Sequence, residues 1–188
     1  MARLPDLVPA GSVELRRWDP TFAAPLCEAV TASLPELRPW MPWAQEAPTV
    51  AGMTQVLAQG AADFAADREW PFVVVEPGTG RILGACGLHP RGAPGTIEIG
   101  YWIRTEATGG GRATAVSRAL TTAAFAHLPD VHTVEIRTDR ANDASAAVPP
   151  KLGFRRAGDV DHAVDAPGQS GRTSVWVMAR ADWDPSTT

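Results

Sequence analysis

The stretch Ile97–Phe125, IEIGYWIRTEATGGGRATAVSRALTTAAF, decides how this chain folds. An apolar strand leads through a short polar turn into three consecutive glycines, Gly109–Gly111, and then into a run with helical periodicity. A glycine turn that enters a helix leaves several backbone N–H groups without partners, and the helix dipole adds positive potential there. The stretch therefore predicts a binding site for a phosphate or pyrophosphate group.

The glycine turn Thr108–Thr114, TGGGRAT, narrows the choice of phosphate ligand. It lacks the G-K-[ST] ending of the loop that binds a nucleoside triphosphate with magnesium. As a dinucleotide fingerprint it has Thr114 where the third glycine belongs, and hairpin strands precede it. A connection that merely tolerates glycine is the structural alternative, but three glycines carry a backbone entropy cost that calls for a geometric reason.

Composition limits the class of protein. The 188 residues, 45% hydrophobic and 20% charged, are typical of one globular domain, which we expect over residues 1–188 with its core at about 13–181. A net charge of −4 argues against nucleic-acid or anionic-membrane partners. The two cysteines and four histidines show no metal-ligand spacing, which fits a reduced, cytoplasmic setting without a metal. No stretch approaches 18 apolar residues and the N-terminus has no signal-peptide pattern, so we expect no membrane span.

Periodicity and turn residues predict the other elements. The expected strands are 13–18, 70–76, 81–89, 96–103, 132–139, 154–164 and 173–181. Helices are expected from Phe22, from a Thr49 cap, from the glycine turn to about His127, and from Asn142. Prolines 35, 39, 42 and 48 predict a loop. Because hairpins alternate with strand–helix–strand crossovers, the order predicts a mixed sheet covered by helices, an α/β (α+β) fold.

Three motifs resemble one family. Thr108–Ala113 resembles the acyl-CoA loop [QR]-x-x-G-x-[GA] of the GNAT superfamily of N-acetyltransferases, with Thr108 in place of Arg or Gln. Asn142–Phe154, NDASAAVPPKLGF, is similar to the N-x-x-S-x-x-V-x-x-K-L-G-F stretch of its ribosomal-protein-type branch, RimJ/RimL. Leu37–Trp43, LRPWMPW, is similar to the tryptophan-rich segment of that branch. The matches together run from roughly residue 13 to residue 181.

The resemblance implies a mostly antiparallel mixed sheet that is splayed open between the strands 96–103 and 132–139. Pantetheine of acetyl-CoA would lie in the gap, with the diphosphate on the N–H groups of residues 109–114. Arg112 either adds charge there or is a solvated helix side chain. The residues that the resemblance assigns to the cofactor are Trp102, Ile103, Gly109, Gly110, Gly111, Arg112, Ala113, Thr114, Asn142 and Ser145.

Two prolines interrupt the last helix of this pattern. Pro149 and Pro150 cannot donate backbone hydrogen bonds, and interior proline costs about 3 kcal/mol. Val148 is pushed towards extended geometry because it precedes a proline. We therefore predict a single helical turn at about 143–147 followed by a kink.

Amide formation from a thioester needs a base for the amine, a donor for the oxyanion and a proton for the thiolate. Glu98 shares a strand face with Gly100 and Trp102, and other GNAT enzymes carry a catalytic glutamate at the corresponding place. Glu98 is therefore the first candidate base, with a structural glutamate as the alternative. His89, at a strand end, is a second candidate. By resemblance, a backbone N–H near Trp102 or Ile103 binds the oxyanion.

Ser145 is the candidate acid for the coenzyme thiolate. Many GNAT enzymes use a tyrosine there, but the only tyrosine of this chain is Tyr101, on the strand. Asn142 and Ser145 share a helix face because they are three residues apart. The alternative is that Asn142 only caps the helix and Ser145 is a first-turn residue without a catalytic role.

Trp40 and Trp43 lie on the proline-rich loop and could contact the acceptor. Tryptophan offers a flat apolar wall with one N–H donor, which suits a channel for an amine substrate. Plain packing in the core is the alternative for both. With His89, they complete the expected acceptor site.

The pattern favours an acetyl-CoA-dependent N-acetyltransferase that acts on a primary amine by direct attack in a ternary complex. The acceptor candidates are a protein N-terminus, a polyamine or aminoglycoside, and an amino-acid-like metabolite. A non-catalytic acyl-CoA-binding or regulatory module, a transferase of a bulkier group such as succinyl, and a nucleotide-binding dehydrogenase are the alternatives. Related enzymes are often homodimers, but no segment of the sequence identifies an interface.

Overall fold

The computed structural model describes residues 3–185, and its strands form one twisted sheet in the order β1-β2-β3-β4-β5-β6-β8-β7. Every neighbouring pair is antiparallel except β5 and β6, which are parallel. The strands are β1 Leu7–Ala10, β2 Val13–Arg17, β3 Trp70–Val75, β4 Ile82–His89, β5 Thr96–Ile103, β6 Thr133–Asp139, β7 Arg155–Asp161 and β8 Arg172–Ala179. The expected mixed, mostly antiparallel α/β sheet is confirmed.

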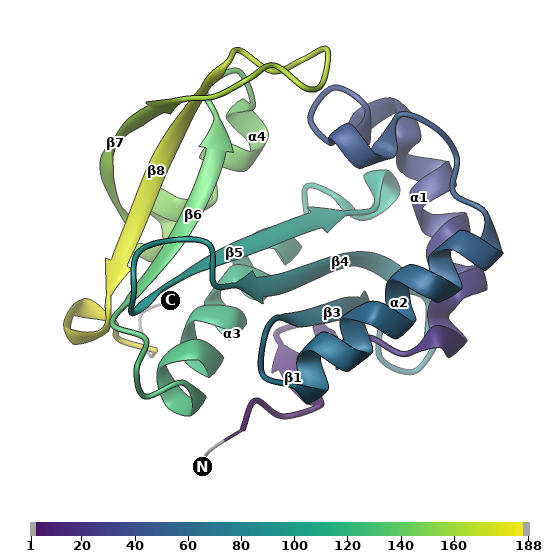
Figure 1. The fold of residues 1–188 in the computed structure, drawn as a ribbon, viewed down its shortest axis with the longest axis horizontal. Helices are drawn as coiled ribbons and strands as arrows, with labels where there is room; N and C mark the ends of the chain where they lie inside the picture. The colour runs from purple at the N-terminus through teal and green to yellow at the C-terminus, as the bar shows by residue number, and fades with distance from the viewer. Residues whose placement is uncertain (1–2, 186–188) are drawn as a thin grey trace.

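Helices cover both faces of this sheet (Figure 1). The helices are α1 Ala23–Leu37, α2 Val50–Ala65, α3 Arg112–His127 and the single turn α4 Asp143–Ala146. On one face, α1 and α2 pack against each other and against β3 and β4. On the other face, α3 contacts β5, β1 and β4. Thr49 caps α2, as expected, because its hydroxyl accepts the N–H of Gly52 at 3.1 Å.

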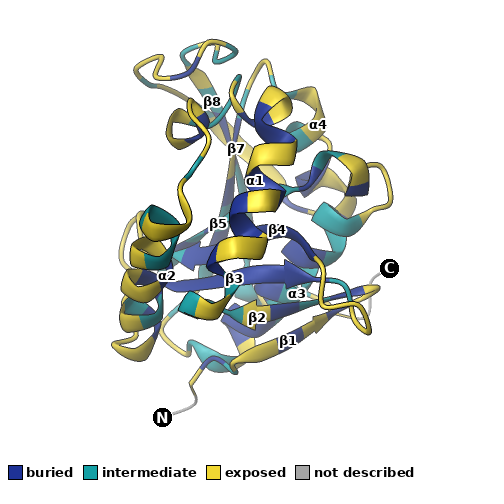
Figure 2. Ribbon diagram, turned by 90° about the vertical axis from the view of Figure 1, so that its right-hand side faces the viewer, coloured by how far each residue is buried: buried dark blue, intermediate teal, exposed yellow. Residues whose placement is uncertain are grey.

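Side-chain alternation along the strands divides the interior between the two faces. In β5, Ile97 and Ile99 are buried in the main hydrophobic cluster with Val116 and Leu120 of α3. Trp102, which points the other way, packs against the clusters formed with α1 and α2. Figure 2 shows β3 and β4 buried between the helices, whose outer turns are exposed. The sheet thus lies between two helical layers and presents different side chains to each of them.

β5 and β6 separate after four residues of pairing. Thr96–Ile99 pairs with Thr133–Ile136, and the two strands then diverge (Figure 1). Beyond this point β5 pairs only with β4, as far as Ile103, and β6 only with β8, as far as Asp139. The predicted splay between these strands is confirmed. It leaves backbone groups of the second half of β5 without a strand partner on the β6 side.

One expectation from the sequence is wrong and one strand was missed, and burial explains both. Pro35 does not end α1, which continues to Leu37 because Leu34 and Leu37 are buried on its inner face while Pro35 stays exposed. This burial offsets the hydrogen bond that proline cannot make. Strand β1 was not expected. Its alternation is only four residues long, and it forms a hairpin with β2 that buries Val8 and Ala10.

The segment after Asn142 folds as predicted except at Val148. That residue was expected to be extended because it precedes a proline, but it keeps helical geometry at φ −79° and ψ −53°, and its buried side chain offsets the steric cost. α4 is a single turn, and a 3-10 turn, Pro149–Leu152, follows it. The two prolines supply no N–H groups for continued α-helical bonding. Gly153, at φ +77°, then ends the turn in the left-handed region.

Candidate active site

The N-terminus of α3 is open to a ligand. Its N-cap residue, Gly111, has φ +73°, and no side chain caps the helix. Gly109 has φ +79°, and a Cβ at either glycine would meet no atom within 4 Å. Both positions therefore combine a backbone that disfavours other residues with free space outside it. The first-turn N–H groups have no side-chain cap, which suits an anion.

Arg112 supplies charge beside this loop. Its Nη1 donates to the carbonyl of Ala107 at 2.9 Å, and it lies 2.7 Å from the place of a Cβ on Gly110. The side chain is therefore folded back over the glycine turn and does not extend into solvent. Thr108, where the family pattern has Arg or Gln, donates its hydroxyl to the carbonyl of Thr105 at 2.7 Å. The positive potential of the loop thus comes from Arg112 and the helix end.

On the face towards α1 and α2, β4 and β5 carry the first group of candidate residues. Glu98 lies directly opposite His89 in the antiparallel register, and the next pair on this face is Gly87 with Gly100. His89 Nδ1 lies 3.0 Å from a carboxylate oxygen of Glu69. These residues lie on the sheet face that α1 and α2 cover, at the point where β5 and β6 separate.

Glu98 has an ion-pair partner across the parallel pair. Its carboxylate lies 3.6 Å from Nε of Arg137, and its side chain is 19% exposed. Arg137 also bonds the carboxylate of Glu135 at 3.1 Å. Two carboxylates thus share one guanidinium, so this part of the face carries a formal charge of −1.

The two loop tryptophans have different environments. Trp43 lies 6.2 Å from Trp102 between ring centroids, and 54% of its surface is exposed. The two rings therefore form an apolar wall on the same face as Glu98. Trp40 instead meets the β7–β8 connection, because its backbone carbonyl accepts the side-chain amide of Gln169 at 3.0 Å.

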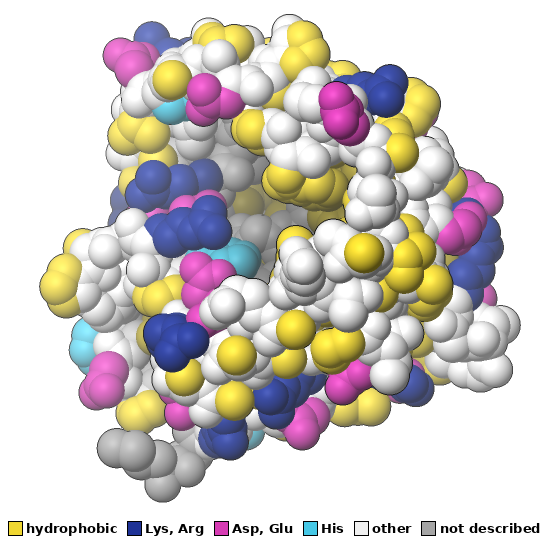
Figure 3. All heavy atoms as spheres, turned by 45° about the vertical axis from the view of Figure 1, so that its right-hand side comes forward, with side chains coloured by type: hydrophobic (Ala, Val, Ile, Leu, Met, Phe, Trp, Pro, Cys, Tyr) yellow, Lys and Arg dark blue, Asp and Glu magenta, His cyan; other side chains and the backbone are white. Residues whose placement is uncertain are grey.

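A hollow marks this face in the space-filling view. Figure 3 shows charged side chains of both signs on one side of the hollow and hydrophobic side chains on the other. A ligand bound there would meet apolar walls together with a few charged groups, which is the usual composition of a small-molecule site.

On the opposite face, Tyr101 meets Ser145. The Tyr101 hydroxyl lies 3.1 Å from the Ser145 hydroxyl and 3.3 Å from the Ser145 carbonyl. Burial raises the pKa of the Tyr101 phenol, and the bond with Ser145 only partly opposes this. The sequence did not predict this pair, because 44 positions separate the two residues and no local pattern connects them.

Asn142 is the helix cap that the sequence suggested. Its side-chain oxygen accepts the N–H of Ser145 at 3.1 Å. The cap holds Ser145 in the first turn of α4, next to the end of β6. A contact of Asn142 with a cofactor stays a prediction.

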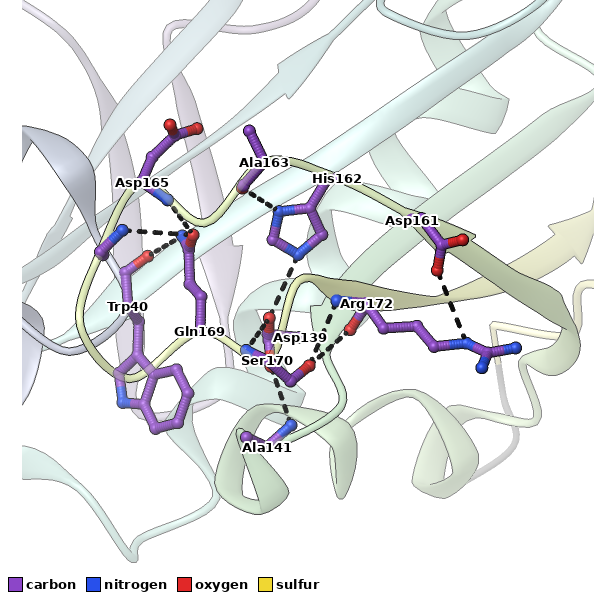
Figure 4. Close-up of polar contacts among 11 residues, drawn as sticks. Trp40, Asp139, Ala141, Asp161, His162, Ala163, Asp165, Gln169, Ser170 and Arg172 are labelled. Carbon is purple, nitrogen blue, oxygen red and sulfur yellow. Dashed lines mark hydrogen bonds and ion pairs between the residues drawn. The ribbon is translucent and has the colours of Figure 1, made fainter.

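The loop between β7 and β8 joins the two halves that the splay separates. Its Gly168 N–H donates to the carbonyl of Pro39 at 2.8 Å, and Gln169 bonds Trp40 (Figure 4). Pro39 and Trp40 belong to the segment between α1 and α2. The β7–β8 loop, residues 162–171, therefore closes one side of the hollow.

Asp139, the last residue of β6, anchors this loop (Figure 4). Its carboxylate accepts the N–H of Ala141 at 2.8 Å and of Ser170 at 3.0 Å, and lies 3.2 Å from His162 Nε2. Desolvation opposes ionisation, but these hydrogen bonds together hold the pKa of Asp139 below its ordinary value. The anchored loop thus depends on an ionised carboxylate.

Other chemistries find little support in residues 3–185. This part of the chain holds no group of three or more His, Cys, Asp or Glu side chains arranged to bind a metal ion. Cys27 and Cys86 are buried, and desolvation raises the pKa of both thiols, so neither is an activated nucleophile. No helix in the described range is long and apolar enough to cross a membrane.

The same combination of splayed sheet and glycine loop defines a family of transferases. Residues 12–155 match the family described as "Acetyltransferase (GNAT) domain". The match spans well over half of the sequence. This chain therefore belongs to the GNAT acetyltransferase family.

Several proteins that resemble this chain carry names from the ribosomal-protein branch of the family. The chain is 31% identical over 106 residues to the protein named "Putative ribosomal N-acetyltransferase YdaF" of Bacillus subtilis, a match that spans 56% of this chain and 57% of that one. It superposes on Mycobacterium smegmatis RimJ, solved with a CoA disulfide, with a TM-score of 0.79 and 27% identity, covering 92% of this chain and 85% of that one. RimL, a ribosomal L7/L12 α-N-protein acetyltransferase solved with coenzyme A, gives a TM-score of 0.82 at 18% identity, covering 92% and 97%. At that identity the likeness shows the fold alone.

We predict that Asp139→Ala loosens the β7–β8 loop. The substitution removes the carboxylate that accepts hydrogen bonds from the N–H groups of Ala141 and Ser170. We expect this to lower the stability of the loop by about 1–3 kcal/mol. Amide hydrogen exchange in residues 163–171 should become at least about 5-fold faster at that cost, with protection in α3 unchanged. Asp161→Ala is the control, because Asp161 is exposed and its one ion pair is 3.9 Å long.

The same anchor predicts a pH dependence. Because the folded pKa of Asp139 is lowered, its contribution is present above the ordinary aspartate pKa of about 4 and is lost as the pH falls through the lowered folded value. Wild-type loop protection, normalised to α3, should therefore be constant between about pH 5 and 7 and decrease below about pH 4. Equal loop exchange in Asp139→Ala and wild type at pH 6 would contradict the anchoring role.

Proposed function

We propose that this protein is an N-acetyltransferase that moves an acetyl group from acetyl-CoA to a primary amine by direct attack in a ternary complex. One observation carries the proposal: the gap between β5 and β6 opens beside the uncapped N-terminus of α3 in a chain of the GNAT family. The gap can admit an extended chain with amide groups, and the helix end can bind its diphosphate.

The described residues suit coenzyme A in three ways. Gly109 and Gly111 leave open space beside the first-turn N–H groups of α3, where Ala113 and Thr114 also lie. Arg112 holds a guanidinium next to the same loop. The backbone of β5 around Trp102 and Ile103 has no partner strand on the side of the gap, so it can bond pantetheine and the oxyanion. RimJ and RimL structures with coenzyme A or its disulfide support this assignment.

The amine would approach from the face that carries α1 and α2. This face presents Glu98, His89 and the wall formed by Trp43 and Trp102. Glu98 and His89 are the candidates on this face for taking a proton from the amine. Trp40, which bonds the β7–β8 loop, would border the acceptor site from the other side.

Ser145 would give a proton to the departing thiolate from the opposite face. Because burial raises the pKa of Tyr101, the phenol keeps its proton at neutral pH and acts as a donor. When Tyr101 donates to the Ser145 hydroxyl, the serine proton is free to point elsewhere. We therefore assign Tyr101 the role of a positioning residue for Ser145.

The acceptor follows from the relatives only by analogy. Names such as ribosomal-protein acetyltransferase favour a protein N-terminus as the first candidate, with a small polyamine or an amino-acid-like amine next. A bulkier acyl group such as succinyl, or acyl-CoA binding without turnover, are the competing functions.

The direct test follows thiol release from acetyl-CoA with a panel of amines, including peptides with free N-termini. We expect acceptor-dependent release of coenzyme A and acetylated product by mass spectrometry. Succinyl-CoA, run in parallel, decides the acyl group. Binding of acetyl-CoA without turnover on any acceptor would favour the non-catalytic module, and absence of binding would contradict both functions.

The glycine loop predicts a selective loss of cofactor affinity. Gly111→Ala places a side chain at φ +73°, which costs about 1–2 kcal/mol, and projects it into the proposed ligand space. Gly80→Ala is a matched control, because Gly80 has φ +71° and open space but lies in the turn before β4. Calorimetry should show at least about 10-fold weaker coenzyme A binding for Gly111→Ala alone, the equivalent of about 1.4 kcal/mol. Equal affinities would place the diphosphate elsewhere.

Ser145 and Tyr101 predict a non-additive pair. Ser145→Ala should lower kcat about 10- to 100-fold with little change in the KM for acetyl-CoA. Tyr101→Phe, which keeps the ring, should lower kcat by a smaller factor. The double variant should be no slower than Ser145→Ala, because Tyr101 acts through Ser145. Unchanged turnover of Ser145→Ala would remove the acid role.

A further inference from the structure

The imidazole of His89 lies over two glycines of the sheet, on the face that α1 and α2 cover. This face, from which the amine would approach, is called the acceptor face below. Its Nε2 is 3.0 Å from the place of a Cβ on Gly87 and 3.4 Å from that on Gly100. These glycines face each other in the β4–β5 register, one pair further along than His89 with Glu98. Side chains at both positions would crowd the ring, so their absence lets the imidazole reach towards the gap that begins after Ile99.

Glu69 determines which ring nitrogen is available. Its carboxylate, which only accepts hydrogen bonds, lies 3.0 Å from His89 Nδ1. The proton of a neutral imidazole is therefore held on Nδ1, and Nε2 carries the lone pair. Nε2, above Gly100, is then the nitrogen that can accept a proton.

Glu98, unlike His89, already has an ion-pair partner of opposite charge. Its carboxylate pairs with Arg137, which also bonds Glu135. Arg137 lies against one oxygen of this carboxylate, so less of the carboxylate is open to an acceptor amine. Other charged groups surround His89 on its neighbouring elements: Asp63 of α2, Glu69 before β3, Arg91 after β4, and Glu98 of β5.

We propose that His89, oriented by Glu69, is the general base that takes the proton from the acceptor amine. The proposal rests on the proposed N-acetyltransferase function and assigns a role within that same site. His89 is the catalytic residue, and Glu69 is a positioning residue that acts through it. Glu98, paired with Arg137, contributes negative charge near the ammonium and does not take the proton.

The proton balance is complete. An acceptor ammonium gives one proton to His89 Nε2, and the free amine attacks the thioester carbonyl carbon. The new N–C bond gives a tetrahedral oxyanion, whose collapse breaks the C–S bond, and the thiolate leaves with the electron pair. The amide nitrogen loses its second proton, and the thiolate gains one, through Ser145. The proton on His89 then leaves to water.

A groove beside His89 offers a route for that proton. It is open to solvent and lies between α2 and the start of β3, with Gln59, Asp63, Glu69 and Trp18 among its lining residues. His89 thus borders both the acceptor face and a groove that is open to solvent. A base that must release a proton in every cycle needs this access.

The first experiment is the pH profile of kcat/KM for wild type, His89→Gln, Glu98→Gln and His132→Gln, an exposed matched control. Because glutamine cannot take the proton, His89→Gln should be about 100-fold slower at pH 7. The defect should shrink as the pH approaches the pKa of the acceptor amine, because the amine then arrives unprotonated. Glu98→Gln should be slower by a constant factor at every pH, and the control should match wild type.

The second experiment does not depend on turnover. Long-range ¹H–¹⁵N NMR of the free protein at high pH should find the His89 proton on Nδ1. Glu69→Gln should shift this tautomer and lower kcat about 10-fold, with the KM values nearly unchanged. Gln59→Ala, on the same groove, is the control that leaves the tautomer in place.

Two results would overturn the proposal. A defect of His89→Gln that is equal at every pH indicates a structural role. A pH-dependent defect in Glu98→Gln, with wild-type behaviour in His89→Gln, makes Glu98 the base. Failure of the function itself gives a different result, because wild type then transfers no acetyl group while the NMR experiment still reports the Nδ1 tautomer.

Discussion

The parallel pairing of β5 with β6 ends after four residues, and the rest of the site depends on this. Up to Ile99 the two strands satisfy each other's backbone groups, and beyond it each bonds only its outer neighbour. The interruption leaves hydrogen-bonding groups in the middle of the sheet that a ligand can satisfy without breaking a strand. It also places the gap beside the loop that leads into α3, so a ligand in the gap reaches the helix N-terminus. The β7–β8 loop then rejoins the separated halves through Pro39 and Trp40.

Alternation along β5 assigns the two proton transfers to opposite faces. Glu98 and Gly100 point to the face with α1 and α2, where the amine would arrive, and Tyr101 points to the face where Ser145 lies. Acid and base chemistry are thus separated by the thickness of one strand. This arrangement keeps the proposed base, His89, apart from the proposed acid while both border the same gap. Burial serves the acid side, since it raises the pKa of the Tyr101 phenol and preserves its proton.

Much of the fold follows from local signals that act over a few residues. Thr49 and Asn142 cap helices because their side chains reach the backbone three residues ahead. The proline pair at 149 and 150 limits α4 to one turn for a purely local reason. The signal at Pro35 was misleading, because burial of Leu34 and Leu37 outweighs a missing hydrogen bond in α1. Within the site, the glycine loop and Glu98 could be named in advance, whereas the partners of Glu98, His89 and Ser145 could not.

The sequence by itself determined the order of the elements from β2 onward, the open N-terminus of α3 and the strand that carries Glu98, because each depends on periodicity, caps and glycine within a short window. Only the tertiary structure decided that Glu69 orients His89 and that Arg137 pairs with Glu98. It also decided that Tyr101, set aside as a mere strand residue, meets Ser145 across 44 positions. The physical reason is that sheet register and helix docking bring distant residues within hydrogen-bond distance, and both are decided by burial over the whole domain.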